Sequence, residues 1–137
     1  MAEEGGEDMK ASPSMTVWMN EAKEHKDYDK IGMLLVHNGV VRKSARAKVR
    51  DGKADSPDVA QMDFSYDEEK VVYSVERARA MDGIYYVRVW LNDGLLDVGD
   101  DIMYVMVGGD TRPHVIEALE RLVEDIKTNC VVEKEIY

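Results

Sequence analysis

Residues 102–126, IMYVMVGGDTRPHVIEALERLVEDI, contain a strand pattern, a glycine pair and a helix pattern in direct succession. The first six residues are apolar and are followed by Gly108 and Gly109, which is typical of a buried strand that ends in a turn. From Pro113 onward, apolar residues recur at helical spacing, and they are Val115, Ile116, Leu119, Leu122, Val123 and Ile126. This stretch therefore predicts a strand followed by an amphipathic helix that packs on a core.

Outward from this stretch, strand-like and helix-like segments alternate. Apolar runs and period-two patterns predict further strands, over residues 31–41, 59–66, 84–91 and 131–137. Capping residues and apolar stripes predict further helices, over residues 12–24 and 67–81. The turn signal Asn92-Asp93-Gly94 predicts a hairpin, and the charged residues 43–58 predict a long loop or a mobile hairpin. The order of elements predicts an α+β fold with a mostly antiparallel sheet and helices packed on one side.

The composition sets limits on size and compartment. The chain has 137 residues, of which 45% are hydrophobic, so we expect one packed core in a single domain over residues 15–137. Residues 1–14, MAEEGGEDMKASPS, are polar, acidic and glycine-rich, and they predict a disordered N-terminal tail. No apolar run approaches the roughly 20 residues of a membrane span, and the acidic N-terminus is unlike a signal peptide. We therefore predict a cytoplasmic protein without a membrane partner.

Net charge and the few ligand-type side chains argue against two kinds of partner. The formal net charge of −10 argues against general nucleic-acid binding. A single cysteine, Cys130, and three scattered histidines give no metal-ligand spacing. Cys130 lies between two lysines and could be a nucleophile, but a solitary cysteine at a helix end is more commonly a small buried hydrophobe. We expect neither a metal nor a nucleic-acid partner.

The sign of the charge reverses locally after the strand at 31–41. From Arg42 to Lys53, six basic residues accompany one acidic residue. This segment is either an anion site or a solvated basic loop. A second anion site could form at residues 108–112, Gly-Gly-Asp-Thr-Arg. A helix N-terminus and the Arg112 guanidinium could hold a phosphate there. The stretch lacks the full glycine spacing of a nucleotide-binding loop, and such a stretch is more commonly only a turn. These two features alone would make the chain a small-anion-binding domain.

Lys127 and Lys134 are seven residues apart at the end of the last predicted helix. Most lysines in a final helical turn only complement the helix dipole, and this is the simplest interpretation of Lys127. If Arg42, Lys127 and Lys134 converge, neighbouring charge and partial burial would make a lysine a usable proton donor or acceptor. Whether they converge depends on the fold.

The residues around these lysines resemble the large, catalytic subunit of molybdopterin synthase, the MoaE family. The resemblance includes the run KTNCVVEKE at 127–135, the strand end Gly39-x-Val41-Arg42 and the pair Thr111-Arg112. It continues without a gap through residues 94–112, GLLDVGDDIMYVMVGGDTR, and through residues 116–134. It thus spans most of the chain and implies the family's hammerhead-like α/β fold.

The resemblance also implies a reaction and its participants. Members of this family transfer sulfur from the C-terminal Gly-Gly thiocarboxylate of a small ubiquitin-like subunit to cyclic pyranopterin monophosphate, forming the dithiolene of molybdopterin. By resemblance, Lys127 and Lys134 are catalytic, and Arg42, Thr111 and Arg112 bind substrate. No metal or organic cofactor is required for this sulfurtransferase step. The family's large subunit is a homodimer and forms a heterotetramer with two small subunits.

Helix length supports a shared site. Arg112 and Lys127 are fifteen residues apart on one predicted helix, which is about 22 Å at 1.5 Å per residue. If both bind one small ligand, one of them comes from a second copy of the chain.

Several positions depart from the family pattern. Thr111 replaces the histidine of a His-Arg pair, Leu91-Asn92 replaces another such pair, and Glu133 ends a stretch that is Pro-x-Trp in relatives. The chain also ends at Tyr137, where many relatives continue. These departures leave a second hypothesis open, in which the chain is a non-catalytic dimeric binding module that keeps the surface for a sulfur-carrier tail.

Overall fold

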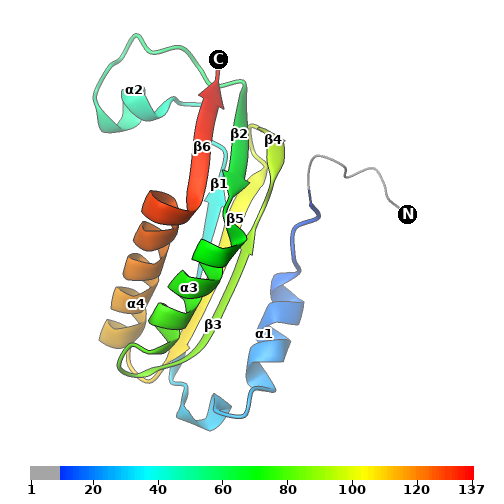
Figure 1. The fold of residues 1–137 in the computed structure, drawn as a ribbon, viewed down its shortest axis with the longest axis vertical. Helices are drawn as coiled ribbons and strands as arrows, with labels where there is room; N and C mark the ends of the chain where they lie inside the picture. Colours follow the sequence, from blue (N-terminus) through cyan, green and yellow to red (C-terminus); the bar gives the residue numbers. More distant parts are fainter. Residues whose placement is uncertain (1–9) are drawn as a thin grey trace.

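The computed structural model describes residues 10–137 and contains two three-stranded antiparallel sheets with helices around them (Figure 1). The helices are α1 (Met15–Lys23), α2 (Arg46–Arg50), α3 (Glu68–Arg79) and α4 (Arg112–Asp125), with a 3-10 turn at Tyr28–Lys30 and a π turn at Ile126–Cys130. The strands are β1 (Met33–Val40), β2 (Gln61–Tyr66), β3 (Ile84–Leu91), β4 (Gly94–Asp97), β5 (Asp101–Gly109) and β6 (Val131–Ile136). The predicted α+β class with antiparallel pairing is confirmed.

The first sheet has the order β1-β5-β3, and β5 is apolar on both of its faces. Val105 and Val107 belong to the main core with α3 and α4, whereas Met106 packs with Trp18 and Ala22 of α1. Because side chains alternate along a strand, these two groups lie on opposite sides of the sheet. Helices therefore cover both faces of β5, with α1 opposite α3 and α4, and the expectation that all helices pack on one side is wrong for α1 (Figure 1).

The second sheet has the order β4-β2-β6, and the hairpin predicted at Asn92-Asp93-Gly94 is wrong. Strand β4 pairs with β2 and not with β3. The Asn92 side chain is only 1% exposed and fixes the connection, because its Nδ2 donates to the Asp101 carbonyl (2.8 Å) and its Oδ1 accepts from the Asp93 N–H (2.8 Å). Leu96 of β4 is then fully buried in the core.

The basic segment that was predicted to be a loop or mobile hairpin contains helix α2 and is closed at its base. The Val59 N–H donates to the Lys43 carbonyl at 2.7 Å. Val59 and Ala45 are both buried in the main core. Core packing at both ends thus fixes where α2 lies, next to β6 and the C-terminal residue (Figure 1).

Gly108 and Gly109 belong to β5 and do not form a loop. They pair with Leu34 and Met33 of β1. A Cβ on Gly109 would lie 2.5 Å from the Gly83 carbonyl oxygen and 2.8 Å from a Val115 methyl carbon. The missing side chain therefore allows the start of α4 to pack closely on the sheet.

The turn from β5 into α4 is closed by an acidic residue, Asp110. Its carboxylate accepts from the Thr111 N–H (2.6 Å) and contacts His114 Nδ1 (2.7 Å). The hydrogen bond from His114 holds the pKa of Asp110 below its ordinary value, and the same bond raises the pKa of His114. A carboxylate at this place argues against a phosphate at residues 108–111 within one chain.

The disordered tail predicted for residues 1–14 falls mainly on residues 1–9, which lie outside the described residues. Residues 10–14 are described, and Ser12 Oγ donates to the Asp101 carboxylate at 2.6 Å. Within residues 10–137, no helix is both long enough and apolar enough to cross a membrane.

Truncation of Phe64 should show how far the second sheet depends on core packing. Phe64 of β2 is fully buried, so Phe64→Ala should lower the free energy of unfolding by about 3–5 kcal/mol. Val132 in the neighbouring strand is 63% exposed, and Val132→Ala should change the free energy of unfolding by no more than about 0.5 kcal/mol. Urea unfolding followed by circular dichroism measures both. Equal losses would mean that Phe64 is not a core residue.

The Asp110–His114 pair predicts a pH-dependent stability. The pKa of His114 is raised above its ordinary 6.5. The pair therefore stabilises the fold fully below pH 6.5, and this stabilisation is lost as the pH rises through the folded-state pKa of His114. The pKa of Asp110 is lowered below its ordinary 3.8, so its contribution is present above that value. His114→Gln should therefore lower the melting temperature more at about pH 5.5 than at about pH 9. A loss that is the same at both pH values would contradict this pairing.

Candidate active site

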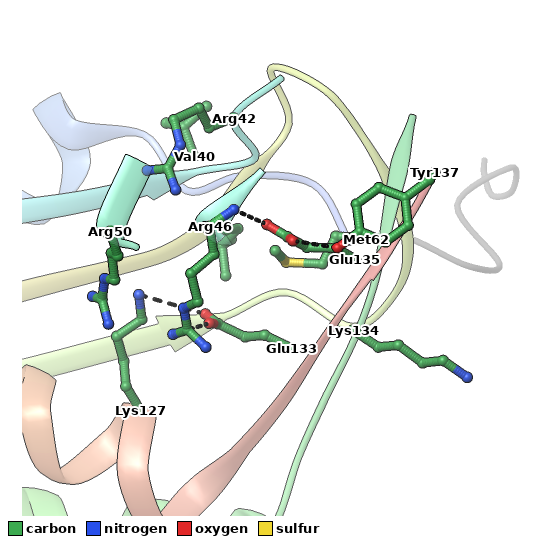
Figure 2. A pocket seen from close by; sticks show the side chains of 11 residues that line it. Val40, Arg42, Arg46, Arg50, Met62, Lys127, Glu133, Lys134, Glu135 and Tyr137 are labelled. Carbon is green, nitrogen blue, oxygen red and sulfur yellow. Dashed lines mark hydrogen bonds and ion pairs between the residues drawn. The ribbon is translucent and has the colours of Figure 1, made fainter. Parts of the chain in front are cut away.

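A pocket of about 340 Å³ opens where β1, α2, β6 and the π turn after α4 meet (Figure 2). Five cationic side chains and two carboxylates line it, although the chain as a whole has a net charge of −10. The polar lining residues are Arg42, Arg46, Arg50, Lys127, Lys134, Glu133, Glu135 and Tyr137. The fold thus gathers positive charge at one concave place on an acidic protein.

Lys127 reaches the pocket from the π turn. The α-helix ends at Asp125, and the chain continues through one wide turn before β6 begins. Such π turns are rare and frequently occur at functional sites. The Lys127 ammonium lies 3.6 Å from a carboxylate oxygen of Glu133, so a residue of β6 holds it in place (Figure 2).

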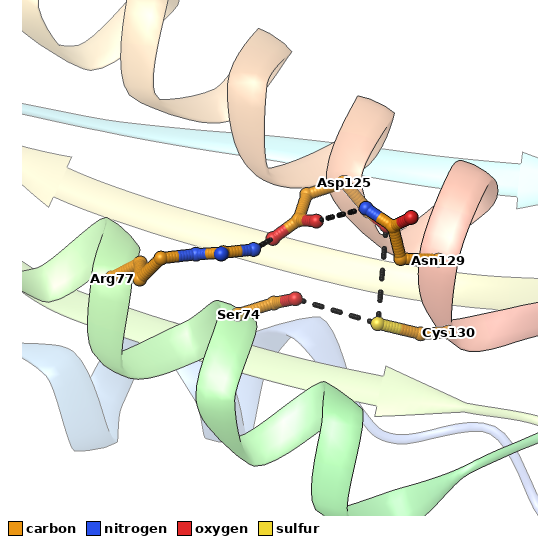
Figure 3. A network of polar contacts seen from close by, with 5 residues as sticks. All are labelled: Ser74, Arg77, Asp125, Asn129 and Cys130. Atoms are coloured by element: carbon orange, nitrogen blue, oxygen red, sulfur yellow. Dashed lines mark hydrogen bonds and ion pairs between the residues drawn. The ribbon is translucent and has the colours of Figure 1, made fainter.

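A network of polar contacts behind the pocket supports this turn (Figure 3). The carboxylate of Asp125 pairs with Arg77 of α3 and accepts from Asn129 Nδ2 at 2.7 Å. Cys130 is 4% exposed, and its sulfur lies 3.4 Å from Ser74 Oγ. Burial alone would raise the pKa of Asp125, but hydrogen bonds from Ser74, Arg77 and Asn129 hold it below its ordinary value. Cys130 is therefore a buried packing residue in this network, as the simpler interpretation of the sequence had it.

Glu133 is the central anion of the pocket. Its side chain is only 12% exposed, and it lies between two cations, with Lys127 at 3.6 Å and Arg46 at 3.7 Å. Within the described chain, its buried Oε2 has no hydrogen-bond partner. This carboxylate separates two positive charges that would otherwise repel each other.

The other residues predicted at the site are placed differently from Lys127. Arg42 lines the pocket, and its Nε donates to the Ser44 carbonyl at 2.9 Å. Lys134 also lines the pocket, but it alternates with Glu133 along β6, and its side chain points away from Lys127 (Figure 2). Lys134 therefore stands at the rim, with its ammonium outside.

Thr111 and Arg112 do not reach this pocket within one chain. Arg112 is the first residue of α4, and Lys127 lies in the π turn beyond its last residue, Asp125. Both Thr111 and Arg112 are exposed, and neither is among the lining residues. Any role for them in the same site requires the α4 N-terminus of another copy.

Next to the pocket, His37 of β1 is a titratable group that no sequence motif marks as a site residue. Burial, and secondarily the positive charge of Lys127, lower the pKa of His37. The imidazole therefore stays neutral near Lys127 to a lower pH than a free histidine would. The position of His37 two residues before Gly39 was the only signal in the sequence that could have marked it as a site residue.

In residues 10–137, no group of three or more His, Cys, Asp or Glu residues is arranged to hold a metal ion.

Comparison with known families assigns this architecture. The model of the MoaE protein family matches residues 14–129. The chain belongs to the MoaE family. The match covers α1 through most of the π turn, and so it includes Arg42, Thr111, Arg112 and Lys127 but not Lys134. A comparison with curated proteins gives no significant match.

Solved structures of MoaE-type proteins share the fold at low sequence identity. A MoaE protein from Burkholderia ambifaria superposes with a TM-score of 0.70 and 20% identity, over 93% of this chain and 79% of that one. Molybdopterin synthase from Staphylococcus aureus gives 0.67 and 18%, over 86% and 83%. A complex of subunits 1 and 2 of molybdopterin-converting factor from Helicobacter pylori gives 0.63 and 19%, over 90% and 80%. These similarities support the fold.

Three residues that depart from the MoaE pattern, Asn92, Glu133 and Thr111, have different roles in the structure. Asn92 is a buried residue that fixes the β3–β4 connection, so it serves the fold and lies outside the pocket. Glu133 provides the anion next to Lys127. Thr111 precedes α4 without making a side-chain capping hydrogen bond.

Two pocket arginines, Arg46 and Arg50, were missed individually because the sequence only placed them in a charged segment. Their spacing of four residues was the available signal, since it puts two side chains on one face of a helix. This spacing was too weak to predict a helix, because Ala45 is a poor N-cap residue and α2 has only five residues.

Proposed function

We propose that this MoaE-family chain is the large subunit of molybdopterin synthase and that its pocket is the site of sulfur transfer to cyclic pyranopterin monophosphate. The supporting observation is that Arg42 and Lys127, 85 positions apart in sequence, line one cationic pocket. A pterin that carries a phosphate requires fixed cations, and the pocket provides them. Its volume of about 340 Å³ is in the range of small-molecule sites.

The proposed step moves one sulfur atom without a change of oxidation state. The thiocarboxylate sulfur of the partner's C-terminal glycine forms a bond to a pterin carbon, and an oxygen substituent leaves that carbon after accepting a proton. Water then cleaves the bond between sulfur and the glycine carbonyl carbon, which leaves a carboxylate on the partner. In this proposal, Lys127 donates the proton to the leaving oxygen and stabilises the anionic adduct.

The remaining site residues have supporting roles in this proposal. Arg42 binds the substrate phosphate. Lys134, whose side chain points outward at the rim, meets the negatively charged tail of the partner as it enters. Thr111 and Arg112 come from a second copy of the chain, because they lie about 22 Å from Lys127 along α4. The functional form is then a homodimer with two small ubiquitin-like subunits, in line with the two-subunit complex from Helicobacter pylori.

Substitution of Lys127 tests the catalytic proposal. In a reaction reconstituted with a thiocarboxylated small subunit and cyclic pyranopterin monophosphate, Lys127→Ala should reduce dithiolene formation by about 10²- to 10⁴-fold, the usual contribution of a general acid. Lys70→Ala on the exposed surface of α3 is the control and should retain full activity. If the wild-type chain binds the small subunit but forms no product, it is instead a non-catalytic binding module.

Mixed dimers test the contribution of the second copy. Lys127→Ala and Arg112→Ala protomers, co-expressed with different affinity tags and isolated as a mixed dimer, should recover activity that neither variant has alone. The reason is that one of the two sites then receives an intact Lys127 from one protomer and an intact Arg112 from the other. A mixed dimer as inactive as both parents would show that the two residues act within one chain, whereas full activity of the Arg112→Ala variant alone would show that Arg112 has no role.

A further inference from the structure

We infer that helix α2 is a substrate-binding element of this pocket: Arg50 binds the phosphate of the substrate together with Arg42, Arg46 adds positive charge beside it, and Glu133 and Glu135 of β6 fix α2 in position for this. The inference rests on the proposed function in its choice of ligand, a phosphorylated pterin. It gives a role to the basic segment that the family resemblance leaves unassigned.

The face that α2 presents to the pocket supports this role. Arg46 and Arg50 are four residues apart and both line the pocket, whereas Lys48 between them does not. Residues four apart lie on the same side of a helix, and a residue two positions away points elsewhere. Two of the three basic side chains of α2 are therefore directed at the pocket by helical geometry.

Contacts with β6 hold α2 there. Ala45 cannot cap the helix with its side chain, and the Glu135 carboxylate accepts from the Arg46 backbone N–H instead, at 2.9 Å (Figure 2). The Tyr137 hydroxyl donates to the other oxygen of the same carboxylate at 3.0 Å. Glu133 attracts the Arg46 guanidinium at 3.7 Å. The acidic residues of β6 thus position the basic helix and do not only neutralise it.

Arg50 has the donors that remain for a ligand. It makes no ion pair or hydrogen bond with any of the other lining residues, and its side chain points toward Lys127 (Figure 2). Arg46 is already paired with Glu133, and the Nε of Arg42 is used by the Ser44 carbonyl. A guanidinium offers five N–H donors in a planar fork that fits the oxygens of a phosphate. A phosphate dianion between Arg50 and Arg42 would also compensate the surplus positive charge of the pocket.

Binding measurements on the full chain test the inference separately from turnover. By isothermal titration calorimetry with cyclic pyranopterin monophosphate, Arg50→Gln should raise the dissociation constant about 10- to 100-fold, the effect of one charge-assisted contact. Lys48→Gln removes the same charge from the same helix and should have little effect. Arg46→Gln should weaken binding as well, and unaltered melting temperatures would show that the variants are folded.

Glu135→Ala tests whether Glu135 positions helix α2 or only adds negative charge near the pocket. Loss of a negative charge near the pocket would by itself strengthen anion binding, whereas loss of the α2 anchor should weaken it. Tighter binding by Glu135→Ala, or equal weakening by Arg50→Gln and Lys48→Gln, would overturn the inference while the proposed function stands. No binding by the wild-type chain would overturn both. Binding that depends on Arg50, without dithiolene formation in the reconstituted reaction, would support the inference and refute the proposed function.

Discussion

The structure depends on one strand, β5, that is apolar on both faces. Val105 and Val107 face the helices α3 and α4, while Met106 faces Trp18 of α1. A strand of this kind must be covered on both sides, and it forms the centre of its sheet with β1 and β3 beside it. Helix α4 follows β5 directly and packs back on it, so the position of the π turn that carries Lys127 is set by this core.

Around that turn, charge is organised by pairing. The cations of the pocket come from three separate parts of the chain, and the carboxylates of Glu133 and Glu135 lie among them. Without these carboxylates, the same cations would repel one another in a partly desolvated space. Glu133, which pairs with Arg46, and Glu135, which accepts from the Arg46 backbone N–H, thus belong to the same arrangement as the basic helix α2.

Much of the fold could be predicted from the sequence because the signals are local. The limits of β3, the capping of α3 by Asp67 and the amphipathic α4 follow from alternation, caps and helical spacing. Strand pairing could not be predicted in the same way. A turn signal at residues 92–94 indicates a change of direction, but the buried Asn92 side chain sends the next strand to a different sheet. The glycine pair suggested a loop, yet it serves close packing between β5 and α4.

The sequence by itself determined which residues are charged and which faces are apolar, and through a family resemblance it predicted that Arg42 and Lys127 belong to one site. Only the tertiary structure decided that Lys134 points out from the rim, that Arg46 and Arg50 face inward and that Glu133 lies between two cations. The physical reason is that local periodicity records the direction of a side chain relative to its own element. What that side chain meets depends on contacts between elements far apart in the chain.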